Sequence, residues 1–207
     1  MQRKSMFADI VTSIDEQVIA RALQLNIPKL YMLKPLQSKS LNSSKFKLLN
    51  NASIDVVEIP FTTNAFKALK HYSFVATTFN EQVFNVKKPM LVILDWGFKN
   101  LDGLHQRRSC LNQVLAKQAV LNNKVLVFPV RNVLNANDKA TVLGRAMQDA
   151  KLVQKYGCEF LIATLASNAK ELHTLQTLKS FALMLGFTEH ATKQALEKAS
   201  LTIDKYL

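Results

Sequence analysis

Residues 124–166 read KVLVFPVRNVLNANDKATVLGRAMQDAKLVQKYGCEFLIATLA. The apolar run Val125–Val130 has the length and β-branched content of a buried strand, and so does the run Phe160–Leu165. Between them, Asp138 is placed to cap a helix that ends before Gly157 and carries apolar residues at helical spacing. The stretch therefore predicts a strand–helix–strand unit with two parallel strands.

The same alternation extends through the rest of the chain. Five further runs are typical of buried strands: Met6–Val11, Leu30–Leu33, Val56–Phe61, Phe74–Thr77 and Met90–Leu94. Alternating strands and helices predict an α/β fold with a parallel sheet covered by helices. About seven strands favour a closed TIM-barrel-like (β/α) barrel over an open doubly wound sheet, which remains the alternative. We expect a single barrel domain over residues 1–207.

Segments outside this pattern are informative in two places. The stretch Leu36–Asn51 is rich in Ser, Asn and Lys and predicts a long exposed loop. The two cysteines, Cys110 and Cys158, form no CxxC pair, so we expect buried free thiols in a reducing compartment. No apolar run approaches the roughly 18 residues of a membrane span, and we expect a cytoplasmic protein without membrane contact.

The charge balance points to a polyanionic partner. Lys and Arg number 27 against 15 Asp and Glu, which gives a formal net charge of +12. The excess lies mainly in residues 1–50 and 96–150. Such a field attracts nucleic acid, but charge alone does not choose among polyanions.

Enzymatic chemistry has weaker support. Asp95, Arg131 and Ser167 follow predicted strands, and barrel enzymes hold their active sites at such ends. The four histidines form no HxH or HExxH motif, and the five glycines form no phosphate-binding loop, so we expect no metal or cofactor on this chain. Asp95 as the general base of a hydrolase stays an alternative, although a turn cap explains a lone acid better. Ser167 and Asn168 are typical of a turn or helix cap.

The most unusual polar cluster is DGLHQRRS at residues 102–109. Arg107 and Arg108 can each bind a phosphate through two parallel hydrogen bonds from the planar guanidinium group. His105 can stack on a base or donate a hydrogen bond to a phosphate. By spacing alone, a solvated loop explains the cluster equally well.

Two helices carry further expectations. A helix over about Cys110–Leu121 is predicted, with Ser109 as its N-cap. Helical spacing places Arg145, Lys151 and Lys155 along one flank of the later helix, as either a basic stripe or a solvated face.

These residues resemble the RNase P protein component 3 family, the archaeal counterpart of the eukaryotic thirty-kilodalton RNase P subunit. The resemblance covers about Met90–Phe187 and rests on the run GLHQRRSCLN at 103–112, QVLAK at 113–117, Arg131 after a strand and Lys155–Tyr156 before the next. It implies a barrel related to metal-dependent phosphoesterases but without their metal site.

The resemblance also implies function. The chain would be a non-catalytic subunit of an endoribonuclease holoenzyme that removes 5′ leaders from precursor tRNA, with the RNA subunit and its Mg²⁺ ions performing the hydrolysis. Implied partners are the RNase P RNA, precursor tRNA through the complex, the Pop5-like component 2 and other RNase P proteins. A generic basic RNA-binding module is the other alternative.

The matched basic positions imply RNA contacts. They are His105, Arg107, Arg108, Lys117, Arg131 and Lys155. The sequence departs from the family at Gln113 and Gln176, where some relatives have His and Arg, so no role is carried over to those positions.

Overall fold

A computed structural model describes residues 7–35, 48–51, 54–63, 68, 72–97 and 108–207. Its strands are β1 (Ala8–Val11), β2 (Lys29–Pro35), β3 (Leu48–Asn51), β4 (Ile54–Phe61), β5 (Val75–Thr78), β6 (Met90–Ile93), β7 (Lys124–Pro129) and β8 (Phe160–Ala163). Its α-helices are α1 (Glu16–Gln24), α3 (Gln113–Leu121), α4 (Val130–Leu134), α5 (Lys139–Tyr156), α6 (Leu175–Met184), α7 (Glu189–Glu197) and α8 (Ala199–Asp204). Two short 3-10 helices are η1 (Glu81–Asn85) and η2 (Ala169–Glu171). No helix in this described part is both long and apolar enough to cross a membrane.

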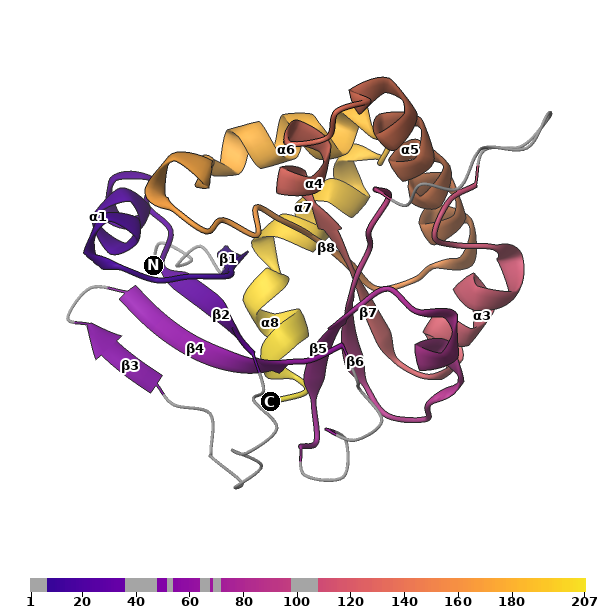
Figure 1. Ribbon diagram of the computed structural model, residues 1–207, viewed down its shortest axis with the longest axis horizontal. Coiled ribbons are helices and arrows are strands. Elements are labelled where there is room, and N and C mark those ends of the chain that lie inside the picture. Colours follow the sequence, from indigo (N-terminus) through magenta and orange to yellow (C-terminus); the bar gives the residue numbers. More distant parts are fainter. Residues whose placement is uncertain (1–6, 36–47, 52–53, 64–67, 69–71, 98–107) are drawn as a thin grey trace.

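The strands form a nearly closed parallel barrel. Neighbours pair in the order β1-β2-β4-β5-β6-β7-β8, and each of these pairs is parallel. A parallel bridge between Val11 and Ala166 joins the two ends of the sheet. The long helices α3, α5 and α6 lie outside the strands (Figure 1). The predicted α/β barrel is therefore confirmed, and the open sheet is excluded.

All seven predicted strands are present within a few residues of their expected bounds, but one strand was not expected. Leu48–Asn51 forms β3, antiparallel to β4, so the predicted loop over Leu36–Asn51 is wrong at its end. Residues 36–47 lie outside the described residues. The physical reason is an open edge, because β4 pairs with β5 only at Phe61–Ala76. β3 covers part of that edge, which would otherwise expose unpaired backbone groups.

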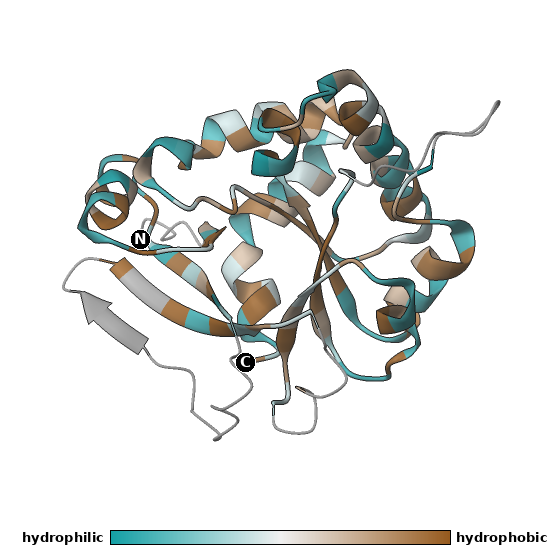
Figure 2. Cartoon of the chain, viewed as in Figure 1, coloured by the Kyte–Doolittle hydropathy of each residue, from teal (hydrophilic) through white to brown (hydrophobic). Residues whose placement is uncertain are grey.

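Alternation along the strands separates two apolar cores. Ile10, Tyr31 and Val127 belong to the cluster inside the barrel, and all are buried. Their neighbours Val11, Leu30 and others pack between the strands and the helices. Figure 2 shows the resulting hydrophobic colour along the strands. This period of two is what a closed barrel with a filled interior requires.

Helix α8 packs against the barrel interior near the C-terminus. Ile203 is fully buried in the interior cluster. The Asp204 carboxylate accepts from the Tyr31 hydroxyl at 2.6 Å and from Lys29 Nζ at 2.7 Å. The rings of Tyr206 and Phe74 stack with their centroids 5.5 Å apart. The end of the chain therefore completes the barrel core.

This packing predicts unequal costs for two substitutions in α8. Ile203→Ala should lower the free energy of unfolding by about 2–5 kcal/mol, because it leaves a cavity in the barrel interior. Leu201→Ala, at a side chain that is 48% exposed, should cost under about 1 kcal/mol. Urea denaturation of both variants measures the difference. Equal losses would show that α8 does not fill the barrel.

Candidate nucleic-acid interface

Asp9 closes the barrel where β1 meets β8. Its side chain is fully buried, and its Oδ1 accepts from the backbone N–H groups of Thr164 and Ile10, both at 2.8 Å. Its Oδ2 accepts from the Thr164 hydroxyl at 2.6 Å. Burial raises the pKa of the Asp9 carboxyl to about 6, against the lowering effect of these hydrogen bonds. Asp9 acts as a structural acceptor at the seam.

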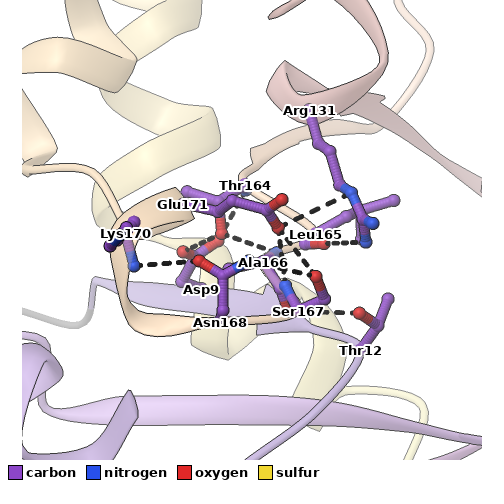
Figure 3. Close-up of polar contacts among 10 residues, drawn as sticks. All are labelled: Asp9, Thr12, Arg131, Thr164, Leu165, Ala166, Ser167, Asn168, Lys170 and Glu171. Carbon is purple, nitrogen blue, oxygen red and sulfur yellow. Dashed lines mark hydrogen bonds and ion pairs between the residues drawn. The ribbon is translucent and has the colours of Figure 1, made fainter. Parts of the chain in front are cut away.

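A polar cluster follows β8 at the carboxyl end of the barrel (Figure 3). Glu171 Oε2 accepts from the N–H and hydroxyl of Ser167, at 2.8 and 3.1 Å. Arg131 Nε lies 3.5 Å from the same oxygen, and its Nη1 donates to the Leu165 carbonyl at 3.4 Å. Burial opposes ionisation of Glu171, but the bonds from Ser167 and the charge of Arg131 outweigh it and lower its pKa. The charge of Arg131 is therefore partly compensated within the protein.

The residues considered for hydrolysis serve local structure. Asp95 Oδ1 accepts from the Gly97 N–H at 2.9 Å, which is the predicted turn cap. Asn168 caps η2 by accepting from the Lys170 N–H at 3.0 Å. Among the described residues, no group of three His, Cys, Asp or Glu side chains could hold a metal ion.

Two side chains of helix α5 form hydrogen bonds with both ends of the connection between β6 and α3. Asp149 is fully buried and accepts from Trp96 Nε1 at 2.8 Å, Cys110 N at 3.1 Å and Leu111 N at 2.9 Å. Arg145 Nη1 donates to the Trp96 carbonyl at 2.9 Å. Asp149 and Arg145 thus fix the residues on either side of the predicted RNA-binding cluster.

This geometry corrects the basic stripe expected on α5. Arg145 is only 5% exposed and points into the protein, whereas Lys151 and Lys155 are exposed. The prediction for Arg145 is wrong because helical spacing alone places a charged residue on the side of the helix that faces solvent. The hydrogen bond from its guanidinium to the Trp96 carbonyl offsets part of the cost of burying Arg145.

The start of α3 also differs from the expectation. The helix begins at Gln113, with Asn112 as N-cap accepting from the Leu115 N–H at 2.9 Å. Ser109 instead donates to the Leu111 carbonyl at 3.0 Å. Cys110 and Leu111 precede the helix, and their N–H groups donate to Asp149 of α5. Both cysteines are buried and free, as predicted.

Two of the predicted RNA-binding residues converge on one aromatic ring. Lys117 Nζ of α3 lies 5.9 Å from the ring centroid of Tyr156, and Lys155 Nζ of α5 lies 5.6 Å from it. Both lysines are exposed, and neither forms an ion pair with another residue of the described part. The arrangement offers two cationic groups beside a half-buried ring, which suits phosphate and base together.

The remaining predicted residues fall elsewhere. Arg108 is exposed just before Cys110, and Arg131 lies at the carboxyl end of β7. His105 and Arg107 lie outside the described residues. The structure therefore groups Lys117 with Lys155 and separates that pair from Arg131. Tyr156 received no separate role from the sequence, although its place beside Lys155 was noted.

Substitution of Asp149 tests whether its carboxylate stabilises the connection between β6 and α3. Asp149→Ala should lower the free energy of unfolding by about 3–5 kcal/mol, because three buried N–H donors lose a charged acceptor. Asp149→Asn should cost less, since one acceptor oxygen remains. Asp138→Ala, which removes an exposed helix cap, is the control and should cost the least. Urea denaturation followed by Trp96 fluorescence measures all three, and a loss for Asp149→Ala no larger than the control would contradict the assignment.

The raised pKa of Asp9 predicts a pH-dependent contribution to stability. Between about pH 4 and pH 6 the folded protein binds a proton at Asp9 that the unfolded chain releases, so this contribution is full below pH 4 and is lost as the pH rises through 6. The free energy of unfolding of wild type relative to Asp9→Asn should fall by up to about 3 kcal/mol over that interval. Denaturant titrations at several pH values measure it. A constant difference would rule out the raised pKa.

Comparisons with known proteins support the fold. No protein-family model matches the sequence, and no curated protein matches it. Among solved structures, the chain is similar to a chain in the cryo-EM structure of archaeal ribonuclease P with mature tRNA, with a TM-score of 0.73 and 15% identity over 96% of this chain and 90% of that one. It is more weakly similar to the crystal structure of an uncharacterized protein, with a TM-score of 0.50 and 6% identity over 98% and 75% of the two chains. The chain thus has the TIM-barrel-like fold of a chain in an archaeal ribonuclease P structure.

Proposed function

We propose that this chain is a protein subunit of ribonuclease P that supports the catalytic RNA in removing 5′ leaders from precursor tRNA. The observation that carries the proposal is the likeness to a chain of archaeal ribonuclease P with mature tRNA, which extends over nearly the full length of both chains. The resemblance of the Gly103–Asn112 run to the component 3 family points to the same complex, independently of the fold.

The basic residues supply the contact with RNA in this proposal. Lys117 and Lys155 neutralise neighbouring phosphates, while Tyr156 between them offers a ring for stacking. His105, Arg107, Arg108 and Arg131 form the second set of RNA contacts. Because Arg131 shares its charge with Glu171, it contributes less than an uncompensated arginine.

The chemistry in this proposal belongs to the RNA. The RNA subunit and its Mg²⁺ ions hydrolyse the phosphodiester, and this chain lowers the repulsion among phosphates that the folded RNA brings together. The Pop5-like component 2 and the other RNase P proteins complete a cytoplasmic ribonucleoprotein. Binding dominated by Lys and Arg weakens steeply as salt is raised.

Reconstitution with RNase P RNA and component 2 tests the proposal. Wild-type protein should restore cleavage of precursor tRNA at Mg²⁺ concentrations where the RNA alone is inactive. The double variant Lys117→Ala, Lys155→Ala should reduce the cleavage rate roughly tenfold at low Mg²⁺, because two charge-assisted contacts are lost. Arg107→Ala with Arg108→Ala should have the same direction of effect. High Mg²⁺ should restore much of the rate in each case.

A matched control separates local contacts from net charge. Lys193→Ala with Lys198→Ala removes the same charge from exposed positions in and after α7 and should leave the rate within about twofold. If wild-type protein fails to restore cleavage, the chain is a generic RNA-binding module instead. Hydrolysis by the protein without RNA that Asp95→Asn abolishes would favour the hydrolase.

A further inference from the structure

Arg131 and Glu171 face each other at the carboxyl end of the barrel. Arg131 Nε lies 3.5 Å from Glu171 Oε2, and Arg131 Nη1 donates to the Leu165 carbonyl at 3.4 Å. Figure 3 shows the Arg131 side chain directed toward the segment that follows β8. The side chains of Arg131 and Glu171 are 35% and 25% exposed, so a ligand at this end of the barrel can reach both. The pair therefore presents a donor and an acceptor side by side.

The Glu171 carboxylate is fixed in this position from within the protein. Its Oε2 accepts from the Ser167 N–H at 2.8 Å and from the Ser167 hydroxyl at 3.1 Å. Glu171 is the last residue of the short helix η2, which Asn168 caps. A carboxylate has about four acceptor positions, so these bonds leave capacity for a donor from outside. Glu171 can thus accept a further hydrogen bond while it stays bonded to Ser167.

A carboxylate at this place restricts the ligands that Arg131 can bind. A phosphate bound by Arg131 meets the negative charge of Glu171, and this repulsion acts against every polyanion. A ligand that also carries a hydroxyl group offsets the repulsion, because the hydroxyl donates to the carboxylate. Lys117 and Lys155 have no carboxylate partner within the described ranges, so they do not distinguish between polyanions in this way.

Ribose carries a hydroxyl group where such a ligand needs it. In RNA the 2′-hydroxyl is on the carbon next to the one that carries the 3′-phosphate, so one nucleotide can offer both groups to Arg131 and Glu171. DNA has the same phosphate but lacks this donor, and the 2′-hydroxyl is the group by which a protein distinguishes RNA from DNA at a given site. Dinucleotide-binding folds likewise use an Asp or Glu as the acceptor for a ribose hydroxyl.

We infer that Glu171 accepts a hydrogen bond from a ribose 2′-hydroxyl of RNA whose phosphate is bound by Arg131, and that this contact selects RNA over DNA. The inference rests on the proposed function, because it takes Arg131 as an RNA contact. It adds the chemical group that is recognised at the carboxyl end of the barrel. A carboxylate that only stabilised the Ser167 backbone would be indifferent to the sugar.

Interference mapping with 2′-deoxynucleotides tests the inference. RNase P RNA with sparse 2′-deoxy substitutions is mixed with this chain and component 2, and the bound and unbound fractions are compared nucleotide by nucleotide. Wild-type protein should exclude at least one 2′-deoxy position by about fivefold, as expected for one hydrogen bond. Glu171→Ala should abolish the exclusion at that position. Glu171→Gln should reduce it, because a neutral amide forms a weaker hydrogen bond than a carboxylate.

Glu197→Ala is the matched control, because it removes the same charge from α7, where the nearest cation is Lys193 at 3.9 Å. It should leave the interference pattern unchanged. Thermal denaturation identifies any loss of folding, and Glu171→Gln, which keeps an acceptor for Ser167, decides the matter if Glu171→Ala does not fold. Two results would overturn the inference: no excluded position with wild-type protein, or the same pattern for wild type and both Glu171 variants. Failure of the proposed function is a separate outcome, since it is read from wild-type protein that does not restore cleavage to the RNA.

Discussion

The carboxylate of Asp9 is the interaction on which the barrel depends. β1 meets the segment that follows β8 through one isolated bridge, Val11–Ala166, in which the Leu165 N–H donates to the Ile10 carbonyl and the Thr12 N–H donates to the Ala166 carbonyl. The chain leaves the strand direction at Leu165, whose φ is 52°. Two short strands with so few shared bonds would leave the Thr164 amide and hydroxyl unpaired in the core, and the Asp9 side chain accepts from both. A charged acceptor makes stronger bonds than a carbonyl, which offsets part of its burial cost.

Asp149 has a corresponding role in the layer of helices outside the barrel, where its carboxylate also accepts from backbone N–H groups. Both carboxylates are fully buried, both have a pKa raised to about 6 by burial, and both accept from backbone N–H groups that no strand or helix satisfies. Asp9 joins the first strand to the last, whereas Asp149 joins α5 to the connection that precedes α3. Buried acids in this protein therefore fix irregular backbone, and burial is the main cause of their raised pKa values.

The regular part of this fold was predictable because it follows from period and length. Seven apolar runs and the capped helix from Asp138 to Gly157 depend on local patterning, and the structure has them all. The predictions that are wrong concern residues whose structural partners are distant in sequence. β3 forms because β4 has an open edge, and Arg145 is buried because Trp96 supplies a carbonyl. Of the site, spacing could single out basic residues, but only the three-dimensional packing of α3 on α5 brings two lysines to Tyr156.

Compensated and uncompensated charges are distributed unevenly between the end of β8 and the outer helices. At the carboxyl end of β8, Glu171 accepts from Ser167 and lies beside Arg131, so those groups are largely satisfied by one another. On α3 and α5 the lysines have no carboxylate partner in the described part of the chain. A polyanion gains most where the protein has not already neutralised its own cations. Within the proposed function, Lys117 and Lys155 therefore offer a polyanion more than Arg131, whose charge Glu171 already compensates in part.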